Sequence, residues 1–109
     1  MAMVIKIRAY HLEDKKMVSP EDISLYTFKY LQEAKHLKLM MFTGLLDKHG
    51  KEIYEGDIVE IIGALNAEVY WDFGSWQLRN QGRTGGLLFD IKEQVKVLGN
   101  IYENPKLLK

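Results

Sequence analysis

The chain has 109 residues, 47% hydrophobic and 28% charged, and its formal net charge is zero. This composition is typical of one globular domain over residues 1–109, and a neutral chain lacks the general attraction to nucleic acid or anionic membranes that a basic protein has. Cysteine is absent, which excludes disulfides, thiolate zinc sites and a cysteine nucleophile. Its first residues do not resemble a signal peptide, and no apolar run approaches ~20 residues. We therefore expect a protein of the cytoplasm with no membrane span.

The first elements show the period of two that is typical of strands. Residues 4–10 alternate, with Ile5, Ile7 and Ala9 on one side and polar residues between them, so a half-buried strand is expected. A polar turn follows, and residues 17–18 could form a short returning strand.

A helix start is expected at Ser19, because serine caps helices and Pro20 suits the first helical position. Residues 25–30 are rich in strand-favouring side chains, which argues against one continuous helix. We expect one capped turn, an irregular or extended stretch, and then a short helix over roughly residues 30–36.

Strand character returns over residues 37–42, with Leu37, Leu39 and Met41 expected to face the core. Two tight turns follow. Gly50 suits a left-handed position that closes the turn at residues 47–50, and a second turn forms where Gly56 supplies a positive φ and Asp57 bonds nearby backbone amides.

The middle of the chain predicts a meander of strands at residues 58–62, 67–71 and 76–79. Val69 and Trp71 are expected to point inward. One tight turn separates Trp71 from Trp76, so the two indole rings should meet across the strands.

Residues 80–86 hold three glycines and no apolar side chain, and we expect a mobile connection there that is a candidate functional loop. The last strand is expected over residues 95–102, with Gly99 marking a bulge. Beyond Pro105 the chain should fray. Evenly spaced short strands with glycine turns predict an all-β or β-dominated fold, an SH3-like, partly closed small barrel with an added N-terminal strand and one short helix.

Catalytic and metal chemistry finds little support. The histidines, His11, His36 and His49, are 25 and 13 residues apart and lack metal-ligand spacing. Four acidic residues could be read as paired catalytic carboxylates, but we favour structural roles for them in turns and at strand edges. These residues are Glu52, Glu55, Asp57 and Asp72. The glycines of residues 82–86 lack the Gly-Lys-Ser/Thr ending of a phosphate-binding loop. We expect no cofactor and no metal.

The aromatic meander offers a candidate binding site. Aromatic strands can stack bases, while core packing is the competing interpretation for Trp71 and Trp76. The interval from Glu52 to Leu78 carries six carboxylates and no lysine or arginine, which disfavours a phosphate backbone. The candidate binding residues are Tyr70, Phe73, Trp76, Arg79 and Arg83.

Several segments together resemble the YopX family of phage and prophage proteins. The matching segments are residues 5–10, Phe42-Thr43-Gly44-Leu45, residues 47–59 and residues 97–105. Leu46 stands where the family favours a polar residue, and His49 where asparagine is common. The resemblance implies a small β-rich protein encoded by a phage or prophage, and it brings no catalytic residues with it.

The leading functional hypothesis is a non-enzymatic interaction or accessory factor that binds a host or phage protein and self-associates as a homo-oligomer. An alternative is a nucleic-acid-associated accessory protein that uses the aromatic strands with Arg79 and Arg83. The third hypothesis is a small enzyme with a carboxylate site that joins Glu55, Asp57 and Asp72.

Overall fold

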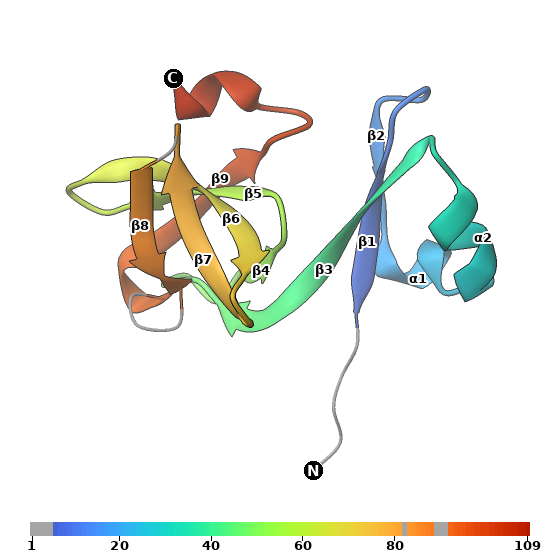
Figure 1. Cartoon of the computed structure of the whole chain (residues 1–109), viewed down its shortest axis with the longest axis horizontal. Helices are drawn as coiled ribbons and strands as arrows, with labels where there is room; N and C mark the ends of the chain where they lie inside the picture. Colours follow the sequence, from blue (N-terminus) through green and yellow to red (C-terminus); the bar gives the residue numbers. More distant parts are fainter. Residues whose placement is uncertain (1–5, 82, 89–91) are drawn as a thin grey trace, which may run out of the picture. The chain divides into compact units, whose positions relative to one another are not determined.

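The computed structural model of the chain describes residues 6–81, 83–88 and 92–109 (Figure 1). These residues form nine strands, two α-helices and two short 3-10 helices. The predicted β-dominated, barrel-like fold is confirmed, because strands in two curled antiparallel sheets make up about half of the chain and helices far less. The chain divides into two compact units, Met1–Phe42 (unit 1) and Thr43–Lys109 (unit 2). The expectation of a single domain over residues 1–109 stays a prediction.

Unit 1 is built on strand β1 (Ile7–His11), which is flanked by β2 (Lys16–Val18) and by the first part of β3 (Leu37–Leu46). Both pairings are antiparallel, and Ala9 lies opposite Val18 on one side and Leu39 on the other. The predicted strand is confirmed from Ile7 onward, as is its short return, whereas residues 4–5 of the prediction lie outside the described residues.

Two short helices cover the apolar side of this sheet. Helix α1 (Pro20–Ile23) begins after Ser19, whose Oγ accepts a hydrogen bond from the Asp22 amide at 3.3 Å, as the sequence predicted. Helix α2 (Phe28–Glu33) is capped in the same way by Thr27. Two helical residues, Ile23 and Leu31, are buried in one cluster with Ala9 and Leu37. The sequence predicted one turn and one helix, and placed the helix about two residues too late.

Unit 2 is a five-stranded antiparallel sheet in the order β8-β7-β6-β5-β9 (Figure 1). Its strands are β5 (Asp57–Ile61), β6 (Leu65–Asp72), β7 (Ser75–Asn80), β8 (Arg83–Leu87) and β9 (Val95–Asn100). Strand β4 (Glu52–Tyr54) is the neighbour of β3. Side chains of these strands, together with Leu88 just after β8, build one apolar core: Ile53, Val59, Ala67, Val69, Leu78, Leu88, Val95 and Val97.

The strand alternation breaks inside β3. Met40 is buried and Met41 is exposed, so the expectation that Met41 faces the core is wrong. Trp71 shares the face of Val69, but it lies near the end of β6, where the core ends, and its side chain is 53% exposed. The inward position expected for Trp71 is therefore also wrong. The expected contact across the turn is present, because the Trp71 and Trp76 rings meet edge-to-face at 5.0 Å.

Two segments are more ordered than the sequence suggested. Residues 83–86, expected in a mobile connection, lie in β8 (Arg83–Leu87), in which Arg83 pairs with Asn80 and Thr84 with Arg79. The expected fraying after Pro105 is also wrong, because Pro105–Leu108 is a 3-10 helix whose Leu107 carbonyl accepts a hydrogen bond from Asn66 Nδ2 at 2.9 Å. Both errors arose because small or polar segments gained order from long-range pairing. The bulge expected near Gly99 is present as a register shift between β5 and β9.

Candidate functional site

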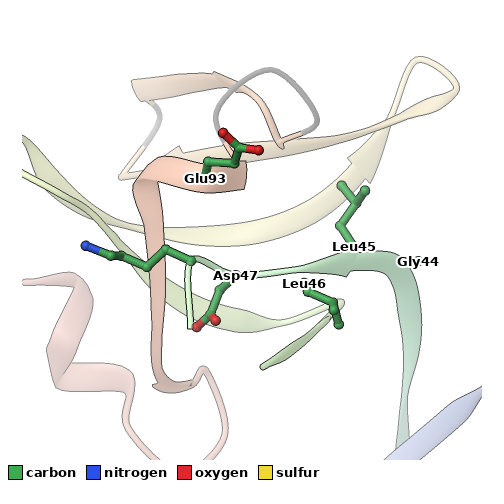
Figure 2. Close-up of a pocket in the computed structure, with 6 residues that line it drawn as sticks. Gly44, Leu45, Leu46, Asp47 and Glu93 are labelled. Atoms are coloured by element: carbon green, nitrogen blue, oxygen red, sulfur yellow. The ribbon is translucent and has the colours of Figure 1, made fainter. Parts of the chain in front are cut away.

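The turn after β3 lies at one side of a hollow of about 610 Å³, which Figure 2 shows. The hollow is lined by residues 44–48 together with Glu93. Asp47 and Glu93 point to opposite sides in this view, as do Leu45 and Leu46. The two carboxylates therefore do not converge on a common point, which a two-carboxylate mechanism requires.

Asp47 is committed to the backbone. Its Oδ1 accepts hydrogen bonds from the His49 and Lys51 amides at 2.8 and 2.9 Å, and its Oδ2 accepts one from the Val97 amide at 2.9 Å. Burial alone would raise the pKa of Asp47, but the amides of Val97, Lys51 and His49 outweigh it and hold the pKa below its ordinary value of 3.8. Asp47 is thus a buried anion that fastens a turn.

The acidic residues considered as catalytic also have local partners. Asp57 is buried, and its Oδ2 accepts a hydrogen bond from the Tyr54 amide at 2.8 Å, which confirms its predicted role in the turn. Asp72 is exposed and accepts one from the Phe73 amide at 2.9 Å. Glu52 accepts one from the Tyr54 hydroxyl at 3.1 Å. In each case the carboxylate fixes its own segment of chain.

The structure separates the five predicted binding residues. Tyr70 and Arg79 share one face of the sheet, where the Arg79 guanidinium carbon lies 4.1 Å from the Tyr70 ring centroid and its Nε 3.3 Å from Glu68 Oε1. Trp76 lies on the other face and packs partly against the core of unit 2. Phe73 occupies the tip of the β6–β7 turn with its side chain 91% exposed. Arg83 begins β8, opposite Asn80.

In the described chain, two histidines that are distant in sequence come together. The rings of His11 and His36 are 4.9 Å apart, and the Tyr30 hydroxyl lies 3.5 Å from His36 Nε2. Among the residues that the structure describes, no group of three or more His, Cys, Asp or Glu side chains is placed to hold a metal ion. None of the described helices is long and apolar enough to cross a membrane.

The sequence did not predict a group of four exposed apolar side chains in unit 1. We call it the aromatic surface, and it consists of Leu25, Tyr26, Phe28 and Tyr30. Leu25 is 82% exposed and Phe28 65%, while Tyr26 and Tyr30 stack at 5.0 Å with their rings 16° from parallel. A groove of about 250 Å³ runs beside it. Described residues of β1, α1 and α2 and of the segments next to them line this groove: Lys6, Ile7, Pro20, Ile23, Ser24, Tyr26, Phe28 and Leu31.

One signal in the sequence could have revealed this surface. Four of the six residues at positions 25–30 are large and apolar, and a helix of six residues can bury only one side of such a segment. Their mixture of helix and strand preferences obscured this signal, because it drew attention to the element type and not to the face left uncovered.

The model of the family described as YopX protein matches residues 3–109. The chain belongs to the YopX family. The turns at Asp47 and Asp57 both fall in the segment that carried the predicted resemblance, and in each a carboxylate that accepts hydrogen bonds from backbone amides holds the turn.

One solved structure similar to this YopX chain is the crystal structure of protein EF1440 from Enterococcus faecalis. The two are 22% identical, the match covers 99% of this chain and 100% of that chain, and the TM-score is 0.72. This likeness shows the fold alone. No curated protein matched the chain.

Proposed function

We propose that this YopX protein is a non-enzymatic interaction factor, encoded by a phage or prophage, that docks onto a protein in the cytoplasm of the bacterial host and also self-associates. The observation that carries the proposal is the aromatic surface. Four large apolar side chains stand exposed within six residues, although small monomeric proteins rarely leave such side chains clustered in water. Aromatic residues of this kind are typical anchors of protein interfaces.

The state of the carboxylates supports a non-enzymatic role. Carboxylate oxygens of Asp47 and Asp57 accept hydrogen bonds from backbone amides. The lowered pKa of Asp47 also makes it a poor general base at neutral pH. A catalytic carboxylate usually has a raised pKa and a free face toward a substrate.

Nucleic-acid binding has less support. Arg79, the cation expected to meet phosphates, is stacked on Tyr70 and paired with Glu68. Trp76 packs partly into the core on the opposite face of the sheet, so Tyr70 and Trp76 cannot form one stacking platform.

Affinity capture from host cells that carry the phage or prophage tests the proposal. The bait is the full chain, compared with a Leu25→Ser/Phe28→Ser variant and with Leu98→Ser, a control at an exposed apolar residue of unit 2. We expect the wild type and the control to retain the same host or phage protein, and the double variant to lose it. Equal retention by all three baits would contradict a role for the aromatic surface.

A further inference from the structure

Phe73 combines two costly features at one position. Its side chain is 91% exposed, and its backbone has φ +51°, in the left-handed region that suits glycine and asparagine. Of the described non-glycine residues with positive φ, the other two are the polar residues Lys15 and Gln81. A large apolar side chain at such a position strains the backbone and gains nothing from burial within its own chain. Features of this kind tend to persist at functional sites.

The turn that carries Phe73 is well fixed. Asp72 Oδ1 accepts a hydrogen bond from the Phe73 amide at 2.9 Å, and Gln77 Nε2 donates one to the Asp72 carbonyl at 2.8 Å. At the base of the turn, Trp71 rests edge-to-face on Trp76 and leaves half its side chain in water. The hairpin therefore presents Phe73 as a pre-organised knob, which loses little entropy on binding.

The groove of unit 1 is suited to such a knob. Its volume is about 250 Å³, whereas a cavity of about 150 Å³ already admits benzene. Apolar side chains form most of its wall, including Ile7, Ile23 and Leu31. We propose that Phe73 of one copy of the chain inserts into the unit 1 groove of a second copy. This inference rests on the proposed interaction function and names a second copy as one partner of the aromatic surface.

Charge favours a second copy as the occupant. Unit 1 has seven basic and five acidic residues, a net charge of +2, and unit 2 has eight basic and ten acidic residues, a net charge of −2. Lys6 is the one charged residue among the described residues that line the groove, whereas Asp72 adjoins the knob. Glu21 and Asp22 on α1 are acidic, and the net charge of unit 1 already includes them. Unit 2 of one copy is thus attracted to unit 1 of another.

The knob and the groove are different surfaces, so the contact is head-to-tail. Each copy offers both surfaces, and association continues until a ring closes or a chain of copies grows. This predicts a specific behaviour of mixed variants. Phe73→Asn removes the knob and suits a positive φ, while Phe28→Ser alters the groove and leaves the knob intact.

Sedimentation velocity of the full chain over a range of concentrations tests the proposal. Wild type should associate, and so should Ile62→Ser, which changes an exposed apolar residue elsewhere in unit 2. Phe73→Asn and Phe28→Ser alone should each bind roughly thirtyfold more weakly or worse, as expected for an aromatic anchor. An equimolar mixture of the two variants should form dimers that grow no further, because it pairs one intact knob with one intact groove.

Asp72→Asn tests the charge contribution, since the amide oxygen can still accept the Phe73 hydrogen bond. We expect roughly two- to fivefold weaker association and a smaller dependence on salt. A monomeric wild type, or Phe73→Asn that associates normally, would overturn the inference. If Phe28→Ser weakens association but Phe73→Asn does not, Phe73 is not the inserted residue, while the aromatic surface remains a docking site. If both single variants associate as strongly as wild type, the insertion of Phe73 is overturned, and the aromatic surface is also not used in self-association.

Discussion

The Val97 amide donates a 2.9 Å hydrogen bond to Oδ2 of Asp47, which joins residues 50 positions apart. The other carboxylate oxygen of Asp47, Oδ1, accepts hydrogen bonds from the His49 and Lys51 amides within its own turn. One buried side chain therefore closes the turn after β3 and attaches it to strand β9. This gives the segment that carries the family resemblance a structural role in the fold.

Asp47→Asn should destabilise the protein by about 2 kcal/mol, because asparagine offers one acceptor oxygen in place of two and leaves a buried amide unpaired. Urea unfolding followed by tryptophan fluorescence measures the loss. Lys48→Ala serves as the control, since the Lys48 side chain is exposed in the same turn and the substitution keeps the backbone hydrogen bond from its amide to the Val95 carbonyl. Equal unfolding midpoints for Asp47→Asn and wild type would contradict the role of this carboxylate.

The lowered pKa of Asp47 predicts that its contribution to stability is lost at acid pH. The pKa of Asp47 is lower in the folded protein than its ordinary value of 3.8, so its contribution is complete above that pH and is lost as the pH falls through the folded pKa. The difference in unfolding free energy between wild type and Asp47→Asn should therefore shrink at acid pH. A difference that stays constant from neutral pH to well below 3.8 would show that the pKa is not lowered.

The raised pKa of Tyr102 predicts that the stability of the protein falls at alkaline pH. Burial raises its pKa above the ordinary value of 10.0, and the negative charges of Glu55 and Glu68 add to the effect. The unfolded chain then loses this proton before the folded one, so stability is complete below about pH 10 and falls above it. Tyr102→Phe should remove part of this alkaline decline. Titration of phenolate absorbance in the wild type and the variant checks the assignment.

Phe73→Asn should raise the free energy of unfolding by roughly 1 kcal/mol, since Asn-Gly is the preferred pair in a turn with two positive φ angles and Gly74 is already present. Thermal unfolding of the monomer at low concentration measures the gain. A destabilised variant would show that the phenyl ring supports its own hairpin, which would remove the reason to assign Phe73 to a partner.

Gly99→Ala should destabilise the chain by roughly 1–3 kcal/mol, because a Cβ at this position would overlap the Asn104 side chain. Combining it with Asn104→Gly tests the cause. The double variant should lose less stability than the two single losses added together. Simple additivity would place the strain elsewhere.

The fold could be predicted where local patterns and tertiary packing agree. Val69 stands between Glu68 and Tyr70 in an alternating strand and is buried as expected. The helix start at Ser19 has a local cause, a side chain that bonds its own helix. The role of Asp57 was predictable for the same reason, because the partner amide lies three residues away.

The site was less predictable, because exposure depends on what other segments cover. Trp71 has the pattern of a core residue and lies half in water at the end of its strand. Phe73 lies in a segment with an ordinary turn pattern, and the sequence alone does not show that its ring is exposed to solvent. Residues 83–87 have no apolar periodicity and become a strand only because β7 offers its edge.

Photo-crosslinking in host cells tests the central claim, that function lies in the aromatic surface and not in the family's turn motif. A photoreactive phenylalanine analogue is placed at Phe28 in one variant and at His49, an exposed residue of that turn, in another. The account predicts covalent protein adducts, including a second copy of the chain, from position 28, and none from position 49. Adducts from position 49 with none from position 28 would contradict it.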